Sequence, residues 1–304
     1  MAGELAGLVH TPVTPFARDG RVDYDAYGKL IEFHLRNGAD ALALPMHAGE
    51  SVSLVGDERR ALLEFAIGRV RGRVPVIAHV SDAGTGIAAG YARHAEDTGA
   101  AAVVATTPYY WTPPPAMVLE HFVGIGAAVK IPFLVHHAPD EMAGSRINTE
   151  LALKLMDRAA NFAGVVDSSL DWQFMVELVD RARRPRPRFQ LFSGAEYMVS
   201  AGAIGAAGAF SSLAAIAPGT VRSLHDLCRK DQLFEARGVQ EEIAALLQLL
   251  KKAGAAGLKA ALRALGRDCG DVRPPLQPLG EEELGRLSEA LAALPAFRME
   301  PRGW

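Results

Sequence analysis

The sequence predicts a (β/α)₈ TIM barrel with a C-terminal helical extension. Short apolar runs rich in β-branched residues recur along the chain, segments with helical spacing separate them, and this order holds for eight runs without a break in composition. The runs are apolar throughout, as expected for parallel strands that are buried on both faces. No Gly-x-Gly-x-x-Gly follows the first run, which argues against a doubly wound dinucleotide-binding sheet.

The elements follow in a regular order. The predicted strands span residues 8–13, 41–44, 74–80, 101–105, 131–136, 162–166, 189–192 and 207–210. The predicted helices between them span residues 24–35, 57–70, 86–97, 115–128, 148–159, 171–182 and 197–204. Asp57 and Glu58 open the second helix with charges that suit a helix N-terminus, and Asn148 is expected to cap the fifth.

The last third of the chain has a different organisation. Helical spacing continues over residues 218–228, 232–252, 257–265 and 281–294, although a barrel needs only one helix after its last strand. We therefore expect a barrel over residues 1–222 and a helical region over residues 223–304 that packs on it.

Composition and charge exclude several classes of protein. A net charge of −3 without basic runs gives no reason to expect nucleic acid or an anionic membrane surface as a partner. No apolar run approaches the roughly 20 residues that a membrane span needs, and the first 16 residues lack the pattern of a signal peptide. We expect a cytoplasmic protein in which Cys228 and Cys269 are ordinary buried thiols.

Titratable side chains gather where the predicted strands end, which is where barrel enzymes have their active sites. These residues are His10, His47, His79, His136, His137, Asp167 and Tyr110. Converging imidazoles suit general acid–base work near neutral pH. An alternative is a divalent metal held by His10, His47, His79, His136 and Asp167. Residues on a strand alternate between the barrel interior and the helix layer, so only one of His136 and His137 points inward.

Several motifs, in order and with compatible spacing, resemble those of one known family. They are Val-Thr-Pro-Phe ending at residue 16, Gly-Glu-Ser at 49–51, Thr-Pro-Tyr-Tyr at 107–110, the strand and loop at 132–139, Gly-Val-Val-Asp-Ser-Ser at 164–169, Ser-Gly at 193–194, the glycine-rich stretch 202–211 and Val-Arg-Pro-Pro-Leu at 272–276. The series is similar to that of the dihydrodipicolinate synthase / N-acetylneuraminate lyase family. That resemblance implies a homo-oligomeric barrel enzyme, a tetramer or a dimer, whose lysine forms an imine with pyruvate for aldol addition or cleavage.

The departures from the family pattern fall on its chemical positions. By the resemblance, the imine lysine falls on Val166, and the proton-relay tyrosine falls on His136. The pair of threonines that binds the substrate carboxylate falls on His47 and Ala48. The arginine that reads the second substrate of the synthase branch falls on or near Glu141, which would repel a dicarboxylate. A genuine dihydrodipicolinate synthase is therefore not expected.

The resulting hypothesis is a lyase of aldolase or hydratase type that uses no lysine imine and no cofactor and acts on a small oxo- or hydroxy-acid-like molecule. The expected catalytic residues are His47, His136 and Tyr110, and the expected substrate-binding residues are Ala48, Glu50, Glu141, Val166 and Gly194. Two alternatives stay open. One is a non-catalytic barrel that binds a small metabolite or a partner protein, and the other is a metal-dependent lyase or hydrolase.

Overall fold

The computed structural model describes residues 5–139 and 146–304. Its centre is a closed, fully parallel barrel in the order β1-β2-β3-β4-β5-β6-β7-β8, in which β8 pairs with β1. The strands are β1 Gly7–His10, β2 Ala41–Leu44, β3 Val76–His79, β4 Ala102–Thr106, β5 Phe133–His137, β6 Phe162–Asp167, β7 Gln190–Ser193 and β8 Gly208–Ser211. The predicted barrel is thus confirmed, although β1 ends at His10 and not at Val13.

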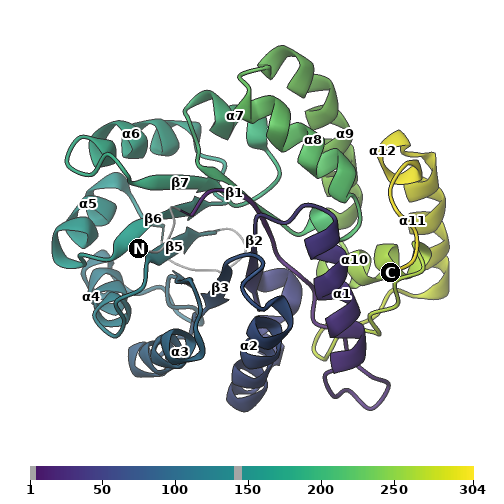
Figure 1. The fold of residues 1–304 in the computed structure, drawn as a ribbon, viewed down its shortest axis with the longest axis horizontal. Coiled ribbons are helices and arrows are strands. Elements are labelled where there is room, and N and C mark those ends of the chain that lie inside the picture. The colour runs from purple at the N-terminus through teal and green to yellow at the C-terminus, as the bar shows by residue number, and fades with distance from the viewer. Residues whose placement is uncertain (1–4, 140–145) are drawn as a thin grey trace.

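Helices surround the barrel in chain order (Figure 1). They are α1 Tyr24–Arg36, α2 Gly56–Val70, α3 Thr85–Thr98, α4 Pro115–Gly126, α5 Thr149–Arg158, α6 Trp172–Arg183, α7 Met198–Ala203 and α8 Pro218–Arg229. Asn148 caps α5 as predicted, since its side chain accepts a hydrogen bond from the Leu151 N–H. The short 3₁₀ helices η1 His47–Gly49, η2 Ser51–Ser53 and η3 Leu213–Ala215 lie in loops that follow strands.

The C-terminal region consists of α9 Leu233–Lys251, α10 Gly254–Ala264, α11 Glu281–Ala293 and the short α12 Pro295–Arg298. Figure 1 shows α10, α11 and α12 together on one side of the barrel, near α1. Buried residues of this region share one apolar cluster with Leu8 of β1 and Leu30 of α1. The expected boundary between residues 222 and 223 falls inside α8, and the division of the chain there stays a prediction.

Two apolar layers fix which way each strand residue points. The inner layer, inside the barrel, contains Val9, Ile77, Val104, Leu134, Val166, Phe192 and Phe210. A separate outer cluster joins alternate strand residues such as Val103 and Val135 to the surrounding helices. This alternation, expected for a barrel, assigns each strand-end side chain to one of the two layers.

Cys228 and Cys269 are both free and buried, as predicted. Burial raises the pKa of the Cys228 thiol to about 11, so it stays protonated at neutral pH. Within the described ranges, none of the helices has the length and apolar character needed to cross a membrane.

Candidate active site

His136 occupies the inner face of the barrel near the C-terminal end of β5. It lies two residues after Leu134 of the inner layer, and it is in register with Val166 of β6. Its imidazole is only 5% exposed, and its Nε2 lies 3.0 Å from the Ser168 hydroxyl. Burial, with smaller contributions from His137 and His47, lowers the pKa of His136 to about 4. A neutral imidazole therefore faces the barrel mouth at neutral pH.

The second nitrogen of His136 is notable because it is buried without a partner. No hydrogen bond reaches its Nδ1 from any described residue. An unsatisfied buried polar atom costs about 1–3 kcal/mol, so such atoms are uncommon unless a ligand or water completes them. His79 Nδ1 and His10 Nε2 share this property, but His10 faces the helix layer, so the property marks the two inward-facing imidazoles, His79 and His136.

His137 has a structural role on the opposite face of β5. Its Nδ1 lies 2.8 Å from Asp167 Oδ1, its Nε2 accepts a hydrogen bond from the Ile147 N–H at 3.3 Å, and its ring packs edge-on against Phe174 of α6. Asp167 is further engaged by the Ser169 hydroxyl. Both His137 and Asp167 therefore face the helix layer. Because successive side chains of β5 point to opposite faces, His136 points into the barrel.

His79 brings a second imidazole to the inner face. It lies two residues after Ile77 of the inner layer, is 6% exposed and bonds through Nε2 to the Ser81 hydroxyl at 2.7 Å. Ser81 in turn accepts a hydrogen bond from the Thr106 N–H. The pKa of His79 is held well below its usual value by burial first, and then by the charges of Arg59, His136 and His47. His79 and His136 thus both lie on the inner face of the barrel near the ends of their strands.

His47 opens η1 in the loop after β2 and is exposed. Its neighbour Ala48 is partly buried and packs against the apolar cluster that includes the C-terminal helices. The expected substrate contact at Ala48 stays a prediction.

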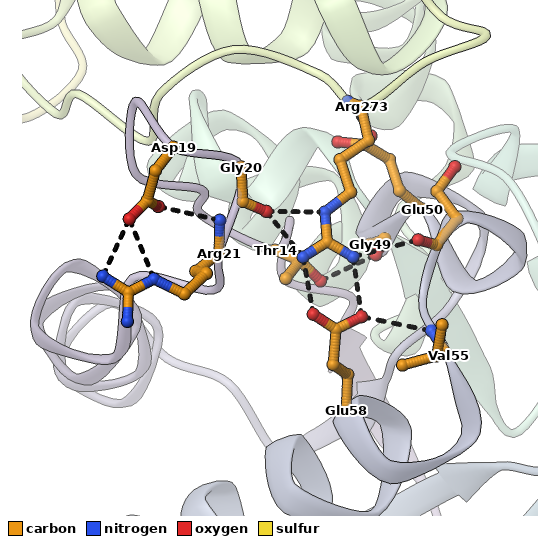
Figure 2. A network of polar contacts seen from close by, with 10 residues as sticks. Thr14, Asp19, Gly20, Arg21, Gly49, Glu50, Val55, Glu58 and Arg273 are labelled. Carbon is orange, nitrogen blue, oxygen red and sulfur yellow. Dashed lines mark hydrogen bonds and ion pairs between the residues drawn. The ribbon is translucent and has the colours of Figure 1, made fainter.

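The expected substrate contact at Glu50 requires correction. Glu50 is 2% exposed, and its Oε1 lies 2.7 Å from Lys259 Nζ. Its Oε2 accepts a hydrogen bond from the Arg273 N–H at 2.9 Å, and both of these residues are labelled in Figure 2. A buried carboxylate paired in this way holds loops together and is not available to a substrate. The sequence motif placed Glu50 in the correct loop but could not reveal its distant partners.

Tyr110 is exposed in the single chain, and its expected catalytic role stays a prediction. Its side chain is 97% exposed, and its backbone has a left-handed conformation with φ 86° in the loop after β4. Within one chain it therefore does not join the buried imidazoles. Tyr109, which precedes it, is the more buried tyrosine of the pair.

Gly194 and Ser168 meet at the ends of β7 and β6. The Gly194 N–H donates to the Asp167 carbonyl, and a Cβ atom on residue 194 would lie 2.1 Å from the Ser168 hydroxyl oxygen. Because Gly194 has no side chain, the Ser168 hydroxyl has space to contact His136. The expected contact of Gly194 with a substrate stays a prediction. Ser168 and Ser81 could not be predicted as neighbours of the imidazoles from the sequence, because a serine without a distinctive motif resembles the other serines of the chain.

Val166, at the position that the resemblance assigns to the imine lysine, is fully buried in the inner layer. None of the seven lysines of the chain replaces it there. Six are exposed on helices or loops: Lys29, Lys130, Lys154, Lys230, Lys251 and Lys252. The seventh, Lys259, is buried on α10 and paired with Glu50.

The five residues of the alternative metal site do not converge. His10 faces outward, where its Nδ1 lies 3.0 Å from Nδ1 of His34 on α1, and Asp167 faces His137. Across the described part of the chain, no group of three or more His, Cys, Asp or Glu side chains has the arrangement of a metal site. Glu141 lies outside the described residues.

Comparisons with known proteins agree with this architecture. The sequence model of the Dihydrodipicolinate synthetase family matches residues 4–294. The chain is 30% identical over 284 residues to 4-hydroxy-tetrahydrodipicolinate synthase of Bacillus subtilis, an alignment that covers 93% of this chain and 97% of the relative. The crystal structure of dihydrodipicolinate synthase from Aquifex aeolicus superposes with a TM-score of 0.90 at 29% identity and covers 96% of this chain and 99% of that one. The Thermotoga maritima enzyme superposes equally well, with a TM-score of 0.90 at 25% identity over 97% of this chain and 100% of that one.

Proposed function

Because the chain belongs to the dihydrodipicolinate synthetase family, we propose that it is a lyase-type enzyme that works without a lysine imine. Its substrate would be a small oxo- or hydroxy-acid-like molecule, and His136 and His47 would transfer protons in the reaction. The observation that carries the proposal is His136, an inward-facing imidazole with one buried nitrogen that has no described partner.

The positions of the lysines support a mechanism without an imine. Val166 has no amine, and Lys259 is the one buried lysine. Its ammonium group contacts Glu50, donates to the Asp271 carbonyl and lies over the ring of Phe16. Burial lowers the pKa of Lys259, but the paired carboxylate favours its charged form, which is not a nucleophile. The relatives' reaction, dihydrodipicolinate synthesis, is therefore not proposed for this chain.

The histidine chemistry is tested by a matched pair of variants. Wild type, His136→Ala and His94→Ala are incubated with a panel of small oxo and hydroxy acids, and substrate loss is followed by proton NMR. His94 lies on α3, where its imidazole contacts Glu64 away from the barrel mouth. Against any substrate that the wild type converts, we expect His136→Ala to lose about 10²–10⁴-fold in kcat and His94→Ala to keep full activity. Full activity of His136→Ala would overturn the assignment.

The imine-free mechanism has its own test. Pyruvate and other oxo acids are incubated with the protein and borohydride, and the intact mass is measured. We expect no covalent adduct. A stable adduct would mean that a lysine forms an imine after all, and peptide mapping would identify it.

A non-catalytic barrel is the second candidate, favoured by the replacement of the imine lysine with Val166 and by the buried pairing of Glu50. Saturable binding of a compound from the same panel, without turnover, would favour this candidate over the enzyme.

We also propose that the chain forms a homo-oligomer. Large apolar side chains are exposed near the loop after β4, including Tyr110, Trp111 at 50% and Met117 at 56%, and an exposed apolar patch commonly marks an interface. Sedimentation velocity should show a species larger than the monomer, and Tyr110→Ser with Trp111→Ser should weaken it. A wild-type monomer would contradict this proposal.

A further inference from the structure

The helix α10 and the segment that follows it contact the loop that carries His47, through Lys259 and Arg273. We propose that Lys259 and Arg273 hold Glu50 in a left-handed backbone conformation, and that this conformation sets the position of the His47 imidazole. The inference rests on the proposed acid–base role of His47. It makes Glu50, Lys259 and Arg273 positioning residues for that site.

The backbone of Glu50 has a left-handed conformation. This residue joins η1 to η2 with φ 54° and ψ 42°, a left-handed conformation that costs free energy for any residue with a Cβ atom. Its N–H donates to the His47 carbonyl at 2.9 Å, so the two residues close one turn. A change in the backbone of Glu50 therefore reorients His47.

Two partners, Lys259 and Arg273, keep Glu50 in that conformation. Its carboxylate is 2% exposed and Lys259 is 3% exposed, with 2.7 Å between Oε1 and Nζ. The Arg273 N–H donates to the other oxygen. Removing either partner of a buried ion pair leaves an uncompensated charge, so rotation of Glu50 away from these partners is strongly opposed.

Arg273 is itself held in place by several contacts. The Arg273 guanidinium contacts both carboxylate oxygens of Glu58 at 2.6 Å and donates to the carbonyls of Gly20 and Ser53 (Figure 2). It also lies 4.2 Å from the ring centroid of Phe16, over the ring. Arg273 thus joins the loops after β1 and β2 to the segment after α10.

A fourth contact completes the loop that carries His47. The Thr14 hydroxyl donates to the Gly49 carbonyl at 2.7 Å, as Figure 2 also shows. The turn from His47 to Glu50 is therefore fixed on one side by Thr14 and on the other by the C-terminal segment. Only the second contact depends on the Glu50 side chain, which makes its effect separable by mutation.

The experiment separates the carboxylate from the backbone conformation. Glu50→Ala with Lys259→Met removes the ion pair without leaving a buried charge, but it keeps a Cβ atom at a left-handed position. Glu50→Gly with Lys259→Met removes the same pair and lets residue 50 remain left-handed at little cost. Imidazole NMR signals and carbethoxylation rates are measured for His47, with His94 as the internal reference, beside the melting temperature.

In the alanine variant we expect displaced His47 signals and a several-fold change in its carbethoxylation rate. In the glycine variant we expect values close to those of the wild type. His94 should be unaffected in both. Unchanged His47 signals in the alanine variant would overturn the inference and leave the pair with a stabilising role only. Equal displacement in both variants would also overturn it, because the backbone conformation would then not be the cause.

If either double variant does not fold, Glu50→Gln serves in its place. It keeps the shape of the side chain and an oxygen for the Arg273 N–H, but it loses the charge that pairs with Lys259. A lower melting temperature with unmoved His47 signals would then overturn the inference, and displaced signals would support it. None of these measurements needs a substrate, so they can succeed even if His136→Ala shows that the proposed chemistry is wrong.

Discussion

At the scale of single residues, the site depends on the absence of a side chain at Gly194. A Cβ atom there would lie 2.1 Å from the Ser168 oxygen and 2.9 Å from the carbonyl carbon of Asp167. The hydroxyl can rotate away, but the backbone of β6 cannot. We therefore expect Gly194→Ala to lower the free energy of unfolding by about 1–3 kcal/mol and to break the contact between Ser168 and His136. Urea denaturation and the NMR signals of His136 measure the two effects.

Gly68 provides the matched control for this substitution. Gly68 lies within α2 on its solvent-exposed face, and a Cβ atom there would have no neighbour within 4 Å. Gly68→Ala should stabilise the protein by about 0.5–1 kcal/mol, because alanine loses less backbone freedom in a helix. If both alanine variants had the same stability, steric crowding at Gly194 would be excluded as an important effect.

The residue scale is also where the sequence predicted least. Two adjacent histidines end β5, and only the register of the strand decides that His136 faces inward and His137 outward. The residues next to Glu50 in the sequence do not show whether it binds a substrate or a lysine. Its partner, Lys259 on α10, is remote in the chain. Roles of this kind depend on tertiary contacts that a single sequence does not contain.

At the scale of elements, the C-terminal tail takes part in the barrel by capping α8. The Glu300 carboxylate accepts hydrogen bonds from the Gly219 and Thr220 N–H groups and from the Thr220 hydroxyl, at the first turn of that helix. An acidic group there satisfies unpaired donors and complements the helix dipole. We expect Glu300→Ala to lower the free energy of unfolding by about 0.5–2 kcal/mol, as measured by urea denaturation.

The control for this cap is Glu289→Ala on α11. Glu289 is exposed, and substitutions at such sites usually change stability by less than about 0.5 kcal/mol. An effect of Glu300→Ala no larger than that of Glu289→Ala would contradict the capping role. The helical elements themselves were predictable, because periodicity and capping residues such as Asn148 are local signals.

At the scale of the whole molecule, many histidines are buried in the neutral form. Burial lowers the pKa of His10 to about 3 and of His121 and His136 to about 4, and it holds the pKa of His34 and His79 well below the usual value. Below the unfolded value of 6.5 the unfolded chain binds more protons than the folded chain, so falling pH favours unfolding. Stability should be highest above about pH 6.5 and should decline progressively toward pH 4.

Urea midpoints measured between pH 8 and pH 4 test this expectation, and a flat profile would contradict it. Each such histidine contributes up to about 1.4 kcal/mol per pH unit in the range between its two pKa values. His121→Gln should reduce the slope of stability against pH, because glutamine does not titrate. Its amide can still contact the Thr85 hydroxyl that His121 now contacts at 2.9 Å, so the variant should keep the local structure.

The barrel as a whole was the most predictable feature. Eight apolar runs separated by helical segments leave few ways to bury every strand on both faces, and the closed sheet confirms that prediction. The helix that follows the last strand was harder to divide from the helical region, because α8 continues through residue 222.

The pairing of β1 with β8 has a consequence for synthesis on the ribosome. Gly7 and Gly208 are partners in the closed sheet, but they leave the ribosome about 200 residues apart, which corresponds to roughly 10–40 s at ordinary translation rates. Throughout that interval β1 carries an unpaired edge of backbone donors and acceptors. A nascent chain stalled before residue 208 should therefore depend on a chaperone to stay soluble, and that dependence should end once β8 has emerged.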